Sequence, residues 1–144
     1  MARLNTFGLD ELQDAMKHIS KLSDAVKTEM LDSMAKVAKE KVKETGESMG
    51  VRDPNSSVHI LDNITTTKPK LTASGGTEDI TFSGTRPNGK KRLRNAEIAF
   101  IQEYGRRNAP ARPFIGTAMT RHDKQIADAG ADVLGDWIEK EFQK

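Results

Sequence analysis

The chain has 144 residues, no cysteine and a formal net charge of +2, with 35% apolar and 31% charged side chains. This length suits a single domain, taken as residues 1–144, and the apolar content is too high for a wholly disordered chain. The lack of cysteine excludes disulfides, thiolate metal ligands and cysteine nucleophiles. No apolar run approaches the ~20 residues of a membrane span, and no signal-peptide core follows the first basic residue, so neither a signal peptide nor a membrane contact is expected.

Positive charge is concentrated in one part of the chain. Residues 86–112 carry eight basic and two acidic side chains, a net charge of +6, whereas residues 1–85 and 113–144 each have a net charge of −2. A basic segment between two mildly acidic ones suits contact with a polyanion or with the acidic face of a neighbouring subunit.

Helical spacing dominates the first third of the chain. A short helix is predicted at about 8–20 from apolar residues three or four positions apart, namely Leu9, Leu12, Met16 and Ile19. A similar stripe predicts a longer helix at about 24–47, with Ser23 in the position of an N-cap. One continuous helix is the alternative. Gly46 and Gly50 stand where a glycine is expected to end the helix.

The middle of the chain has the composition of short strands and turns. Two segments favour strands through β-branched residues or alternating polarity, residues 65–67 and 79–83. Residues 74–76 are expected to form a turn, and residues 84–92 an exposed loop in which Asn88-Gly89 is a candidate hairpin turn. Because apolar residues are few here, we predict a small antiparallel sheet of three to four strands that needs helices on one face.

The last third is predicted to return to helix. Residues 95–104 partly fit both a helix and a strand, and Gly105 is a candidate αL stop. Prolines stiffen the connector at 108–113, because each disfavours helical backbone in the residue before it. Pro113 suits the first turn of a helix that continues along the stripe Ile115, Met119, Ile126, Val133 and Trp137. The expected fold class is α+β, with the sheet packed against a long N-terminal helix and a C-terminal helix.

No residue pattern in the chain predicts catalysis. The histidines, at positions 18, 59 and 122, are far apart and form no metal-binding pair. The chain has no Gly-x-Ser-x-Gly element, and its glycine pair at 75–76 lacks the lysine and the following helix of a phosphate-binding loop. We therefore expect no enzymatic activity, no catalytic residue, no metal and no cofactor.

The clearest local signal is a cluster of cations beside a glycine turn. Such a cluster presents positive charge to phosphates or to an acidic protein surface. No aromatic residue is interleaved with it, so stacking on nucleic-acid bases is not indicated. We predict an interface or DNA-facing loop, with a solvated hairpin tip as the alternative, formed by Arg86, Lys90, Lys91, Arg92 and Arg94.

A motif near the last helix resembles a known family. Glu103-Tyr104-Gly105 is followed by a basic spacer and then by Pro110-Ala111-Arg112-Pro113-Phe114. Together with Gly8-Leu9-Asp10-Glu11-Leu12 near the N-terminus, this motif resembles the small neck, head–tail joining or tail-completion proteins of long-tailed bacteriophages. Arg106 departs from the threonine or serine that usually follows the glycine in that family.

The resemblance implies a structural virion protein of the head–tail junction, made in the host cytoplasm and assembled into a ring, commonly sixfold. The implied partners are further copies of the chain, tail-tube and head-connector proteins, and DNA in the lumen, contacted without sequence reading. Within the motif, Phe114 is expected to pin the last helix to the core, and Arg112 to hold Glu103 or a nearby carbonyl. The competing class is a small basic nucleic-acid-binding protein, which would bind duplex DNA as a monomer with steep salt dependence.

Overall fold

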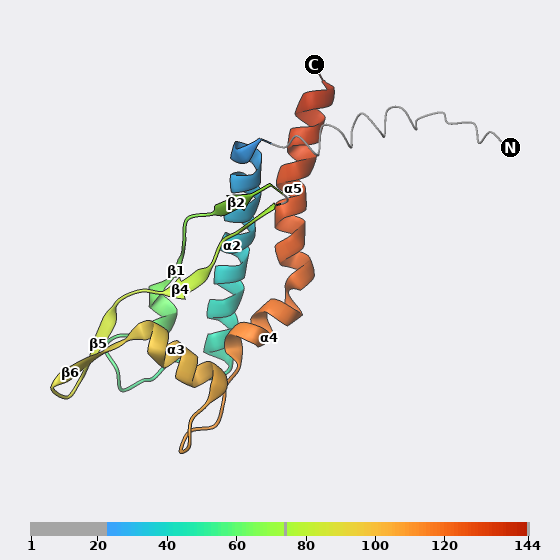
Figure 1. The fold of residues 1–144 in the computed structure, drawn as a ribbon. Coiled ribbons are helices and arrows are strands. Elements are labelled where there is room, and N and C mark those ends of the chain that lie inside the picture. The colour runs from blue at the N-terminus through green and yellow to red at the C-terminus, as the bar shows by residue number, and fades with distance from the viewer. Residues whose placement is uncertain (1–22, 74, 144) are drawn as a thin grey trace, which may run out of the picture.

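In a computed structural model that describes residues 23–73 and 75–143, four helices frame a set of short β-ladders (Figure 1). Helix α2 (Asp24–Ser48) lies antiparallel to the C-terminal helix α5 (Asp123–Phe142). The α+β class is therefore confirmed, while the helix predicted at 8–20 lies outside the described residues. The other elements are η1 (Ile60–Asn63), β1 (Ile64–Thr66), β2 (Lys70–Thr72), β3 (Gly75–Thr77), β4 (Ile80–Phe82), β5 (Thr85–Asn88), β6 (Lys91–Arg94), α3 (Asn95–Tyr104) and α4 (Phe114–Arg121).

The long helix α2 begins where its sequence predicts and ends slightly later. The Ser23 hydroxyl oxygen accepts the backbone N–H of Val26 at 3.3 Å, which satisfies one of the free donors of the first turn. Met49 is the C-cap, and Gly50 follows with a φ of 72°, a value that favours glycine. Gly46, predicted as a helix stop, instead lies inside the last turns of the helix.

The prediction of one sheet of three to four strands is wrong in its connectivity. Within residues 23–73 and 75–143, six strands of three or four residues form three separate two-stranded antiparallel ladders, β1–β4, β2–β3 and β5–β6. Gly75 and Gly76, predicted as a turn, belong to β3, where a Cβ on Gly76 would lie 2.8 Å from Leu31. Each ladder is short and uses a helix, rather than a third strand, to cover its apolar side chains.

The last helix is two helices rather than the single one predicted. Helix α4 ends at Arg121, and its C-cap His122, with a φ of −117° and a ψ of 18°, turns the chain before α5 begins. Gly130 of α5 lies against α2, where a Cβ would meet the Met34 sulfur at 2.6 Å. The glycine therefore allows close approach of α2 and α5, which make the most extensive helix–helix contact in the described chain.

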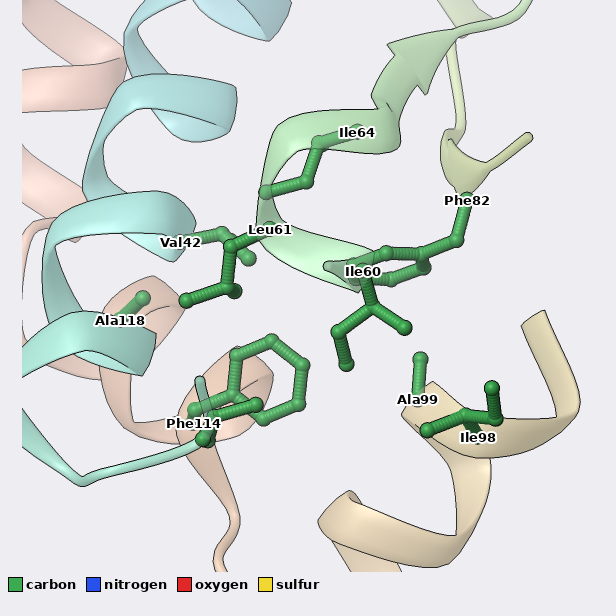
Figure 2. Close-up of a cluster of buried hydrophobic side chains, with 10 residues drawn as sticks. Val42, Ile60, Leu61, Ile64, Phe82, Ile98, Ala99, Phe114 and Ala118 are labelled. Atoms are coloured by element: carbon green, nitrogen blue, oxygen red, sulfur yellow. The ribbon is translucent and has the colours of Figure 1, made fainter. Parts of the chain in front are cut away.

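The core lies where α2, η1, β4, α3 and α4 meet (Figure 2). Phe114, the first residue of α4, is fully buried and contacts Phe82 edge-on, with ring centroids 5.9 Å apart. The expectation that Phe114 pins the last helical region to the core is confirmed. Its other neighbours in the cluster are aliphatic or small, namely Val42, Val51, Ile60, Leu61, Ile64, Ile98, Ala99 and Ala118.

The tight packing of this core can be tested by a substitution at Gly46. A Cβ at position 46 would lie 2.6 Å from a Leu61 methyl and 3.2 Å from the Phe114 ring. We expect Gly46→Ala to lower the free energy of unfolding by about 1–3 kcal/mol, because overpacking outweighs the better helix propensity of alanine. The measurement is urea unfolding followed by circular dichroism.

Gly135→Ala is the matched control, because position 135 is also helical but has no atom within 4 Å of the added Cβ. We expect this variant to gain up to about 1 kcal/mol from helix propensity alone. Equal effects of the two substitutions would contradict the tight packing at Gly46.

Candidate functional site

The family-like motif forms an elbow between α3 and α4. Gly105 ends α3 with a φ of 75° and a ψ of 178°, so it occupies a glycine-only extended region rather than the expected αL region. A Cβ there would lie 2.8 Å from the Ala111 backbone nitrogen. Arg106 and Ala109 then exchange both backbone hydrogen bonds, at 2.9 and 3.0 Å, which closes a tight turn and sends the chain back toward α3.

Glu103 and Arg112 hold the two sides of this elbow. The Glu103 carboxylate accepts the backbone N–H groups of Ile115 at 2.8 Å and Gly116 at 2.9 Å, so the end of α3 caps the start of α4. Arg112 does not bind Glu103. Its Nη1 donates to the Gly50 carbonyl at 2.7 Å, which confirms the alternative of a nearby carbonyl and ties the elbow to the end of α2.

The two prolines of the motif have exposed side chains, and their role is to constrain the backbone. Pro113 has a φ of −74° and a ψ of 67°, the geometry of an inverse γ-turn, and the Phe114 N–H donates to the Arg112 carbonyl at 2.7 Å. Pro113 therefore precedes α4 as its N-cap instead of standing in its first turn. Pro110 lies in the exposed, irregular segment between the tight turn and Arg112. Most residues of the motif therefore stabilise the fold, and Tyr104 is the exception.

The basic segment predicted as an exposed loop is a β-hairpin. Strands β5 and β6 pair from Thr85↔Arg94 to Asn88↔Lys91, which puts the turn at Gly89-Lys90, one residue later than predicted. Gly89 has the positive φ, 62°, that a two-residue hairpin turn needs. Figure 1 shows the hairpin projecting from the body beside α3.

The base of this hairpin is fixed by Asn95. This asparagine is fully buried, its side-chain amide donates to the Ser83 carbonyl at 2.7 Å, and its backbone N–H donates to the Gly84 carbonyl at 3.0 Å. These bonds hold the two ends of the hairpin together at the start of α3. The hairpin is therefore anchored at its base, while its tip extends into solvent.

The five hairpin cations divide into two groups. Arg92 donates to the Thr85 hydroxyl at 2.7 Å, and Arg94 forms an ion pair with Glu97 at 2.8 Å, so these two arginines stabilise the hairpin and its junction with α3. The side chains of Arg86, Lys90 and Lys91 have no ion pair with any described residue. Lys90 and Lys91 are exposed at the tip, which leaves them available to an anionic partner.

Arg86 lies apart from the tip, in a polar groove of about 330 Å³. The groove also contains Arg112 and Arg52. Sequence reasoning missed Arg52, which binds Asp62 and Glu47 and lowers the pKa of both carboxyls through these hydrogen bonds. Because Arg52 and Arg112 are both engaged, the groove's arginines mainly hold the loop after α2 in place.

An exposed aromatic pair lies on the outer face of α3. Phe100 is 63% and Tyr104 70% exposed, and their ring centroids are 4.8 Å apart, as expected for side chains four positions apart on a helix. The pair borders a shallow groove of about 390 Å³, in which Ile80 and Ile115 contribute apolar walls. Phe100 could not be assigned from sequence, because residues 95–104 partly fit both periods.

Comparison with family models, curated proteins and solved structures found no match to this chain. Among the described residues, no helix is long and apolar enough to cross a membrane, and no three acidic or histidine side chains gather as metal ligands would. The features on which we base a function are the elbow, the hairpin tip and the aromatic pair.

The capping role of Glu103 in the elbow can be tested by substitution. We expect Glu103→Ala to lower the free energy of unfolding by about 0.5–2 kcal/mol, because two backbone donors at the start of α4 lose their acceptor. Thermal and urea unfolding measure the change. Glu40→Ala, an exposed glutamate within α2, is the control and should stay within about 0.5 kcal/mol of the parent. A loss at position 103 no larger than that at position 40 would refute the capping role.

Proposed function

We propose that this chain is a structural subunit of the head–tail junction of a long-tailed bacteriophage. Copies of it form a ring, commonly sixfold in proteins of that kind, which completes the tail and joins it to the head connector. The ring's further partners are the tail-tube and head-connector proteins, and its place is the neck or upper tail of the virion. The resemblance of the motif at 103–114 is the starting point, and the joint action of those residues as one elbow supports it.

The exposed aromatic pair is the observation that carries this proposal. Two neighbouring aromatic rings left in solvent beside an apolar groove are typical of a protein–protein contact, where aromatic side chains supply much of the binding energy. Phe100 and Tyr104 stand on α3, which the elbow and Asn95 fix at its two ends. The surface is therefore rigid, and little conformational entropy is lost when a neighbouring copy covers it.

Charge supplies a second, complementary pair of surfaces. Closed rings need a heterologous interface, in which one patch meets a different patch on the next copy. The hairpin tip carries Lys90 and Lys91, and α5 carries an exposed acidic row with four-residue spacing, Asp128, Asp132 and Asp136. Because the two features lie on different parts of the molecule, contact between the tip of one copy and the row of the next would propagate around a ring.

The aromatic surface is tested by self-association. We expect Phe100→Ser with Tyr104→Ser to abolish oligomers that the parent chain forms at high concentration, as measured by sedimentation velocity and native mass spectrometry. Phe142→Ser is the control, because Phe142 is an aromatic residue, 57% exposed, at the other end of the molecule on α5. A parent chain that stays monomeric both alone and with tail-tube protein would contradict the proposal.

The charged surfaces are tested by reversal and rescue. We expect Lys90→Glu with Lys91→Glu, and separately Asp132→Lys with Asp136→Lys, to weaken self-association, and the four substitutions together to restore it. In phage carrying these variants, electron microscopy should count fewer joined heads and tails for each pair than for the combination. If the four substitutions together fail to restore association, the proposed pairing of the hairpin tip with the acidic row is refuted.

The same variants separate the competing function, a small basic nucleic-acid-binding protein. That function predicts that the monomer binds duplex DNA, that binding weakens steeply with salt, and that Lys90→Glu with Lys91→Glu abolishes binding. The exposed lysines at the tip favour this second candidate. If the chain binds duplex DNA and never self-associates, the nucleic-acid-binding function is the correct one.

A further inference from the structure

The polar groove of about 330 Å³ is built from segments that lie far apart in the sequence. Strand β5 contributes Arg86, α3 contributes Ile98 and Gln102, and the elbow contributes Arg112. Residues 50–54, in the loop after α2, form a further wall, and the hydrogen bond from Arg112 ties this loop to the elbow. Because its walls are already joined, the groove loses little conformational entropy when a ligand binds.

Two arginines of this groove carry charge that no described carboxylate neutralises. Arg86 is half-buried, and its guanidinium makes no hydrogen bond or ion pair with any described residue. Arg112 donates to a neutral carbonyl, so its positive charge also has no counter-ion. Arg52 differs, because Glu47 and Asp62 both bind its guanidinium. A partly buried charge without a partner is unfavourable, and an anion in the groove would relieve this cost.

The other polar side chains of the groove leave it positively charged. Asp53 is the acidic residue among those that line the groove, and its Oδ1 accepts the backbone N–H of Asn55 at 2.9 Å. One carboxylate therefore stands against the two unpaired arginines. The side chain of Gln102 is half-buried and has no hydrogen bond with any described residue, so its amide is a further free donor.

The arrangement of these donors indicates the class of anion. Arg86, Gln102 and Arg112 belong to three different segments around the groove. A carboxylate offers two oxygens in one plane, whereas a phosphate group offers at least three oxygens in different directions. The guanidinium fork of arginine matches the oxygens of a phosphate. An oxyanion of this shape can accept hydrogen bonds from all three segments at once.

We propose that this groove binds a phosphate group, with Arg86 as the principal charge and with Arg112 and Gln102 as further donors. The group comes from free phosphate or from a nucleic-acid backbone, because both present the same oxygens. The proposal does not depend on self-assembly, since every donor comes from one copy of the chain.

The site is tested by titrating inorganic phosphate into the isotope-labelled chain at constant ionic strength. We expect saturable chemical-shift changes at the backbone amides of Gly50, Ile98 and Gln102, and none along α5. Arg86→Gln should weaken binding about tenfold, because a hydrogen bond to a charged group is lost. Arg121→Gln is the matched control and should leave the affinity unchanged, because this exposed arginine of α4 does not line the groove.

Two further probes identify the ligand. Acetate that binds at the same amides as tightly as phosphate would overturn the assignment to phosphate. A short DNA duplex separates the sources: if Arg86→Gln weakens duplex binding as well, a nucleic acid supplies the phosphate, and if it weakens phosphate binding alone, the ligand is the free anion. Equal losses in the two arginine variants, or no saturable shift with either phosphate or the duplex, would refute the site. Sedimentation of the same variants reports on the ring separately, so that either proposal can fail without the other.

Discussion

The fit of Phe114 against Gly46 is the contact on which the rest of this structure depends. Position 46 has no side chain, so the Phe114 ring and Leu61 approach the last turns of α2 closely. Because Phe114 is the first residue of α4, its burial fixes where the C-terminal helices begin. From this point α4 leads into α5, which returns along α2 (Figure 1).

The elbow transmits this fixed position to the outer surface. Glu103 links the end of α3 to the first turn of α4, and Arg112 links the connector to the carbonyl of Gly50 after α2. Helix α3 is thereby held at its far end, while Asn95 holds its start together with the hairpin base. One face of α3 therefore packs into the core, while its other face presents Phe100 and Tyr104 to solvent. This arrangement is suited to a building block whose contacts must keep a constant geometry in every copy.

Some local sequence signals were confirmed, although the stop predicted at Gly46 and the turn predicted at Gly75-Gly76 were not. Ser23 predicted the start of α2, Gly105 the end of α3, and the prolines the non-helical connector, because each effect acts within a few residues. The hairpin was recognised but misplaced by one residue, since Gly89-Lys90 and Asn88-Gly89 satisfy the same turn chemistry and only the pairing of β5 with β6 separates them. The single sheet was wrong, because the pairing of short strands depends on which helix covers them.

The sequence by itself determined the α+β class, the long first helix, the charge segregation and the glycine–proline elbow, because composition and local conformational preference set these features. The sequence also predicted the burial of Phe114, whereas tertiary structure decided how the other residues of the elbow are used. It assigned Glu103 to a helix cap and Arg112 to a carbonyl, and it left Phe100 and Tyr104 in solvent. These outcomes depend on contacts between residues far apart in the chain, such as Gly46 with Phe114, and no local pattern records such distances.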